Sequence, residues 1–137
     1  MGWDAYATMP DGQDVEQEWT ESENGHLPTD PRIREAFAAA VRRARAMVQE
    51  LGDPEGVIDG FLENAALDCS ACAQVLEKAT GRSAYEPLRW SPEDVQELAR
   101  TAVFPKASDH LHPWAVASAW EFLTTCAALG LGIRFSW

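Results

Sequence analysis

Residues 3–19 read WDAYATMPDGQDVEQEW, and this stretch decides which fold the sequence favours. Its first six residues have the composition of a strand. Pro10-Asp11-Gly12 then suits a tight turn, because proline presets its own φ and glycine tolerates a positive one. After the turn, residues 13–19 alternate with the period of two that a half-buried strand requires. An amino-terminal β-hairpin is therefore predicted.

The other end of the chain repeats this pattern. Residues 132–137, GIRFSW, alternate apolar and polar side chains and follow a glycine-rich helix end. A lone hairpin is marginally stable in water, whereas a third strand and a covering helix make it viable. We therefore expect the closing strand to pair with the hairpin, which would bring Trp3, Trp19 and Trp137 into one region.

Helix signals divide the middle of the chain. An aspartate or serine followed by proline can cap the first free amides of a helix, and proline suits the first helical position. Helices are predicted from Pro31, Pro54 and Pro92, which follow such a residue, and from Pro113, which follows His112; residues 53–81 form either one bent helix or two. The fold class is α+β: a helix-dominated single domain over residues 1–137, in which the amino-terminal hairpin and the carboxy-terminal strand form a small antiparallel sheet.

Negative charge is concentrated at the amino end. The first thirty residues contain eight acids and no lysine or arginine, and the whole chain has a net charge of −11. Such a surface repels nucleic acid and attracts basic protein surfaces, although an acidic face can also serve only solubility. The predicted partner-binding residues are the hairpin acids and one tryptophan: Asp11, Asp14, Glu16, Glu18, Trp19, Glu21 and Glu23.

Four arginines lie off the apolar stripe of the first helix, and six tryptophans are spread along the chain. The arginines are expected to pair with acids of the hairpin or of residues 53–68 and so to relieve repulsion. Exposed tryptophans often anchor interfaces, and Trp19 and Trp90 lie beside predicted loops. Trp114 and Trp120 fit core positions better.

Two cysteines three residues apart suggest a second kind of site. Cys69 and Cys72, with His110 and His112, could complete a tetrahedral zinc site, although zinc ribbons usually show two compact cysteine pairs. A CxxC at a helix start can also act in redox chemistry, because the helix lowers the pKa of the thiol. The third interpretation is that both cysteines are small buried residues, with no metal or other cofactor bound.

The expected compartment and the expected lack of catalysis both depend on signals that the sequence does not contain. Three cysteines and no secretory leader are typical of a reducing cytosol, so a cytoplasmic location is expected. The apolar run of residues 114–132 is long enough for a membrane span, but Glu121 interrupts it, which favours a buried helix and no membrane contact. No phosphate-binding loop, nucleophile elbow or dinucleotide motif is present, so the sequence gives an enzyme no support.

The segments MGWDAYAT, DCSAC and GLGIRFSW resemble a group of small uncharacterised proteins of bacteria and their phages. The resemblance implies an intracellular bacterial or phage setting and no particular activity. In that setting we expect an acidic, non-enzymatic protein-binding module, in its most specific form an anti-CRISPR-like inhibitor of a nucleic-acid-handling defence complex. Two alternatives remain open: a zinc-binding or redox domain that uses the CxxC, and an antitoxin-like or immunity-like protein that neutralises a basic toxin.

Overall fold

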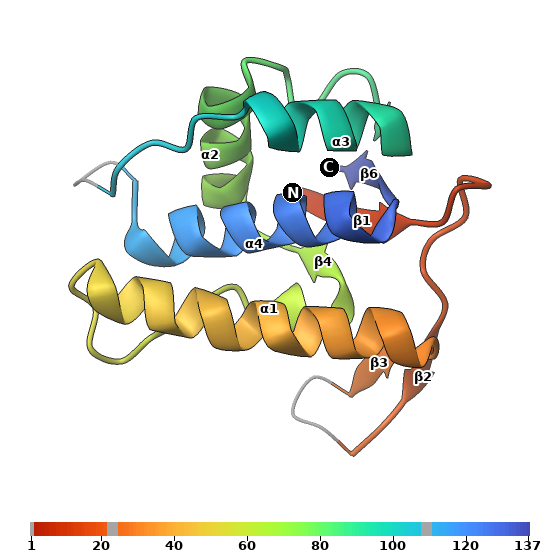
Figure 1. Ribbon diagram of the computed structural model, residues 1–137, viewed down its shortest axis with the longest axis horizontal. Coiled ribbons are helices and arrows are strands. Elements are labelled where there is room, and N and C mark those ends of the chain that lie inside the picture. The colour runs from red at the N-terminus through yellow and green to blue at the C-terminus, as the bar shows by residue number, and fades with distance from the viewer. Residues whose placement is uncertain (1, 22–24, 108–110) are drawn as a thin grey trace.

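The computed structural model describes residues 2–21, 25–107 and 111–137. In these ranges the chain is an α+β domain, as expected, with four α-helices and a small antiparallel sheet (Figure 1). The helices are α1 (Pro31–Glu50), α2 (Ser70–Thr80), α3 (Pro92–Thr101) and α4 (Pro113–Leu129), with a short 3-10 helix η1 (Leu62–Asn64). The strands are β1 (Asp4–Thr8), β2 (Gln17–Trp19), β3 (His26–Pro28), β4 (Ala66–Leu67), β5 (Arg89–Trp90) and β6 (Gly132–Ser136).

The two ends of the chain meet in the middle of the main sheet. The strand order is β4-β1-β6-β5 and every pair is antiparallel, with Ala5 of β1 opposite Phe135 of β6. The small side chain of Ala5 leaves room for the aromatic ring of Phe135, which stacks on Trp3 and meets Trp90 edge to face. The closing strand is therefore a central strand of the sheet.

The amino-terminal hairpin differs from its prediction in one respect. Residues 9–13 form the expected turn, but residues 13–19 pair with β1 only through an isolated bridge between Thr8 and Asp14. Val15 is buried against the core, and the chain then turns away so that β2 pairs with β3 in a separate two-stranded sheet. Trp19 is exposed and its ring contacts His26, whereas Trp3 is buried against Phe135 in the main sheet. The expectation that Trp19 shares one aromatic region with Trp3 is therefore wrong.

Helix capping follows the sequence signals closely at α1 and α3. The Asp30 carboxylate accepts hydrogen bonds from the amides of Arg32 and Ile33, which would otherwise have no partner at the helix start. Ser91 and Asp94 form a reciprocal capping box at α3. Local side chains therefore determine where these two helices begin.

The predicted helix from Pro54 is wrong. Residues 53–61 form turns and an irregular loop, which lead through η1 into β4. The buried Asp59 carboxylate explains the loop, because it accepts hydrogen bonds from the amides of Phe61 and Asp68. Aspartate favours such local bonds to backbone amides over a helix interior.

Helix α4 is the centre of the core. It packs against α1, α2, α3 and the sheet, and ten of its side chains are buried, which explains why it is apolar on all sides. The prediction of a buried helix over the apolar run is thus confirmed. Trp90 is 1% exposed and packs in the same core, so the sequence-based assignment of Trp90 to an interface is wrong. In the described ranges, no helix is both long and apolar enough to span a bilayer.

Candidate protein-binding site

The β2–β3 hairpin is fastened to the rest of the molecule by η1. The side chain of Gln17 donates to the backbone oxygen of Asn64, and the side chain of Asn64 donates to the backbone oxygen of His26. Asn64 therefore contacts both strands of the hairpin at once. A two-stranded hairpin is unstable by itself, so these contacts give it a fixed position.

Helix α1 holds the same hairpin from the other direction. Arg34 donates through Nε to the backbone oxygen of Pro28 at 2.7 Å, and its Nη2 forms an ion pair with Glu18. The amide of Thr29 donates to the backbone oxygen of Glu16, which closes the base of the hairpin. Arg34 thus pairs with a hairpin acid, as predicted, whereas Arg42 and Arg43 pair with Glu35 and Glu121, which lie outside the predicted segments.

Trp19 is the most exposed aromatic residue among those described, at 72% of its surface. Its ring nevertheless has a defined place: it meets His26 edge to face, with 5.4 Å between ring centroids. The ring also packs on Gly25, where an added β-carbon would lie only 2.6 Å from Cζ3 of Trp19. Gly25 has a φ of +74°, so both the backbone and the ring require glycine there. The hairpin therefore presents a large, ordered aromatic surface to solvent.

The predicted acids fall into two groups. Asp14 receives two hydrogen bonds from the Arg134 guanidinium, at 2.9 and 2.8 Å, and these bonds lower the pKa of its carboxyl. Glu18 is paired with Arg34, so both acids have a role inside the molecule. Glu16 and Glu21 are exposed and form no ion pair within the described ranges.

The remaining two acids of the predicted set are Asp11 and Glu23. Asp11 is exposed and accepts a hydrogen bond from the amide of Gln13, which stabilises the turn after β1. Glu23 lies outside the described residues. Asp14, Glu16, Glu18 and Glu21 are thus all exposed, but only Glu16 and Glu21, which lie on either side of Trp19 in sequence, have no ion pair within the described ranges.

The cysteine segment has a different environment from the one that redox chemistry requires. Cys69 precedes α2, and Cys72 is fully buried, where its thiol lies 3.7 Å from Oδ2 of Asp59. Burial and then the negative charge of Asp59 raise the pKa of the Cys72 thiol far above its usual value, whereas a redox CxxC needs a lowered one.

The two histidines of the predicted zinc site do not complete it in the part of the chain that can be described. His112 precedes α4 and stacks on Trp114, and His110 lies outside the described residues. Across the described ranges, no three side chains of histidine, cysteine, aspartate or glutamate come together as metal ligands.

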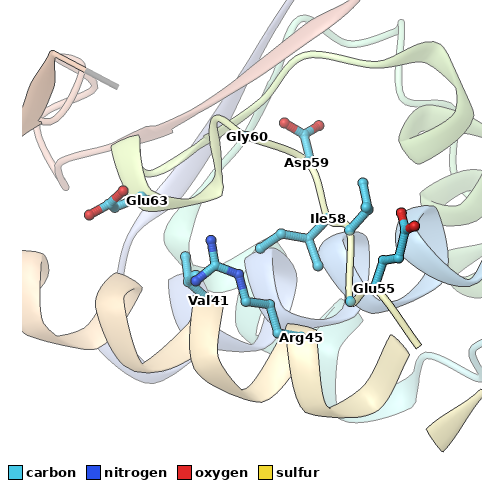
Figure 2. Close-up of a pocket in the computed structure, with 9 residues that line it drawn as sticks. Val41, Arg45, Glu55, Ile58, Asp59, Gly60 and Glu63 are labelled. Atoms are coloured by element: carbon cyan, nitrogen blue, oxygen red, sulfur yellow. The ribbon is translucent and has the colours of Figure 1, made fainter. Parts of the chain in front are cut away.

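A pocket of about 430 Å³ lies between α1 and the loop of residues 55–60. Figure 2 shows the guanidinium of Arg45 entering this pocket from α1, while the carboxylate of Asp59 points away from it. Glu55 and Glu63 stand at opposite ends of the view. Paired acid–base catalysis needs a proton donor and a proton acceptor that both reach one bound substrate, and these charged groups do not converge in that way.

Asp59 instead serves the structure of the loop. Its amide donates to the buried hydroxyl of Ser118 on α4 at 2.9 Å, and its carboxylate receives the bonds from Phe61, Asp68 and Cys72. Burial, followed by the hydrogen bond and charge of Asp59, raises the pKa of Asp68 to about 6. This carboxyl pair joins the loop to the start of α2.

Comparison with protein families, with curated proteins and with solved structures gives no match to this chain. The candidate site therefore rests on geometry and charge. Sequence reasoning missed Asn64, which helps Arg34 to hold the hairpin, and Arg134, which holds Asp14 beside the preceding turn. Neither belongs to a motif, and their partners are 38 and 120 residues away along the chain.

Proposed function

We propose that this protein is a non-enzymatic protein-binding module that docks its β2–β3 hairpin on a basic surface of a partner protein. The observation that carries the proposal is the exposed, ordered ring of Trp19. Tryptophan is among the residues that most often dominate binding energy at protein interfaces. A rigid ring loses little conformational entropy on binding, so its contact area is converted efficiently into affinity.

Charge supports a basic partner. The chain has a net charge of −11, and Glu16 and Glu21 flank Trp19 without an ion pair in the described ranges. Exposed charges at the rim of an interface accelerate association with an oppositely charged partner and lose this effect as salt rises. We therefore assign Trp19 to the centre of the contact and the two glutamates to its rim.

The more specific form of the proposal concerns the partner. A protein that handles nucleic acid offers a basic groove of the required charge, and an acidic hairpin would occupy it in place of the nucleic acid. We propose this competition as the mode of action, by analogy with anti-CRISPR-like inhibitors. Its support is the sign of the charge and its position beside an exposed aromatic ring.

Affinity capture with matched variants tests the proposal. Wild-type protein and Trp19→Ala, Glu16→Lys/Glu21→Lys and Trp137→Ala variants are immobilised and exposed to an extract of bacterial cells. Trp137 is the control, because it is also a partly exposed tryptophan, at 47%, but lies at the end of β6. We expect one set of proteins to be retained by wild type and by Trp137→Ala and lost by the other two variants.

The identity and behaviour of the retained proteins decide the remaining questions. Rising salt should weaken their capture, and added DNA or RNA should compete with it if the partner handles nucleic acid. A basic toxin among them would favour the immunity-like alternative. Equal capture by all four proteins at every salt concentration would contradict the assignment of the hairpin as the docking element.

A further inference from the structure

A groove of about 440 Å³ runs between α1 and α4, away from the β2–β3 hairpin. The two helices lie side by side and run in opposite directions (Figure 1). Small side chains make the groove possible, since Ala36 and Ala39 on α1 face Thr125 and Leu129 on α4 across it. The volume and the mostly apolar lining fall in the range of small-molecule sites, and the groove is open to solvent along one side.

A buried acid forms one wall of this groove. Glu121 is only 4% exposed, although it belongs to a helix whose other buried residues are nearly all apolar. Its Oε1 accepts a hydrogen bond of 2.8 Å from Nε of Arg43, whose own side chain is 56% exposed. Burying a carboxylate is unfavourable unless its hydrogen-bonding capacity is met.

The partner for the second carboxylate oxygen is missing within the described ranges. Oε2 of Glu121 receives no hydrogen bond there, and it is not one of the fully enclosed atoms. One helical turn later, the hydroxyl of Thr125 is buried in the same wall and also has no hydrogen-bond partner in the described part of the chain. The wall of the groove on α4 thus holds a carboxylate oxygen that is open to the groove and, one turn later, a buried hydroxyl without a partner, and only the hydroxyl carries the cost of an unmet hydrogen bond.

The charge of the groove restricts what it can hold. Arg43 already neutralises Glu121, so a second cation would gain little attraction and an anion would meet the remaining carboxylate oxygen. A neutral molecule with an N–H or O–H donor meets neither problem, because it supplies the hydrogen bond to Oε2 and lays its apolar part on the alanines. Hydrogen bonds to a carboxylate are about twice as strong as those between neutral groups.

We propose that the groove between α1 and α4 is a binding site for a small, neutral, mostly apolar molecule that donates one hydrogen bond to Glu121. This site is separate from the proposed protein-binding hairpin and does not depend on it. The other explanation for Glu121 is a purely structural one, in which its ion pair with Arg43 fixes the register of the two helices. If that explanation holds, the groove has no ligand, and it should not distinguish a molecule with a hydrogen-bond donor from a similar molecule without one.

Indole and 1-methylindole form a matched pair of probes for this site. They have nearly the same shape and apolar surface, but only indole has an N–H donor. We expect indole to cause saturable NMR shifts of the Ala39 methyl group and of the Arg43 Nε–H with a dissociation constant in the millimolar range or below. The loss of a hydrogen bond to a charged group weakens binding about tenfold or more, so 1-methylindole should bind at least tenfold more weakly.

Two leucine variants locate the binding. Ala39→Leu fills the groove and should abolish the indole shifts of the Arg43 Nε–H, whereas Ala38→Leu places the same side chain on the same helix outside the groove and should leave them unchanged. Glu121→Gln preserves the shape and the contact to Arg43 and should weaken indole severalfold. Absence of saturable shifts with both probes, equal binding of the two, or equal effects of the two leucine variants would each overturn the proposal. The comparison of the two probes uses wild-type protein, so it decides the matter even if a variant fails to fold.

Discussion

Replacing Phe135 by alanine should remove a large part of the stability of this protein. The ring is 2% exposed in the central strand β6, where it contacts Trp3 and Trp90 at centroid distances of 5.9 and 4.8 Å. Truncation of a buried phenylalanine typically costs about 3–5 kcal/mol, through lost apolar burial and the cavity that remains. A domain of this size has a total stability of about 5–15 kcal/mol, so the variant should remain folded but much closer to its unfolding transition.

Urea and thermal unfolding, followed by far-UV circular dichroism, measure this effect. We expect the melting temperature to fall by roughly 10–20 °C, which follows from the entropy of unfolding of a domain between about 100 and 150 residues. Trp137→Ala is the control: it lies two residues further along the chain but is about half exposed, so it should cost about 1 kcal/mol or less. A loss below about 1 kcal/mol for Phe135→Ala would refute the view that the closing strand is part of the core.

Two further predictions concern charge and pH. Asp14→Asn removes the ion pair with Arg134, and because Asp14 is about half exposed the cost should be at most about 1 kcal/mol at pH 7. The hydrogen bonds from Arg134 lower the pKa of Asp14 in the folded state, so this contribution is fully present above the ordinary carboxyl value of 3.8 and should be lost as the pH falls through the lower, folded-state pKa; a series of melting curves from pH 7 down to well below 3.8 measures the difference. For Asp68 the sign is opposite: its pKa is raised to about 6, so its stabilising proton is present in acid and is lost as the pH rises through 6. The full shift would correspond to about 3 kcal/mol, which solvent screening at this exposed residue reduces to about 1 kcal/mol. Asp68→Asn should therefore be more stable than wild type at pH 7 and lose that advantage near pH 4, and an unchanged pH profile of unfolding would exclude the carboxyl pair as its origin.

The sequence predicts the closing strand and the start of α1 well because their signals are local. Residues 132–137 alternate in register with a buried sheet face, and the start of α1 is fixed by Asp30 and the proline beside it. Such features depend on neighbours a few residues away. These local conformations are kept in the folded protein because the tertiary packing stabilises the same conformations.

The prediction of a helix after Pro54 fails for the opposite reason. Val57, Ile58, Phe61 and Leu62 have helical spacing, but Asp59 forms its hydrogen bonds in a loop and is held by residues up to 59 positions away. A pattern of apolar residues records that burial occurs, not which backbone conformation brings it about. Val57 and Phe61 are in fact about half exposed, so this stripe does not correspond to a buried face.

The candidate site could be predicted only in part. The concentration of acids, the presence of Trp19 and the pairing of an α1 arginine with a hairpin acid can be predicted from the sequence, but the pairing of Asp14 with Arg134 cannot be assigned without the fold. The second strand of the β1 hairpin fails for the same reason: Asn64 and Arg34 hold residues 17–19 against η1 and α1, which a local alternation cannot reveal.

The distribution of the arginines determines which acids remain for a partner. Arg34 and Arg134 bind Glu18 and Asp14 and in doing so fix the hairpin and the turn that precedes it. Reversing the charge of those two acids would therefore disturb the shape of the surface as well as its charge, and any loss of binding would be ambiguous. Glu16 and Glu21 are free of this structural role in the described ranges, so charge changes there report on a partner alone. The ion pairs of Asp14 and Glu18 make these two acids unsuitable as probes of binding. The same contacts fix the hairpin and so give Trp19 a defined position from which to bind.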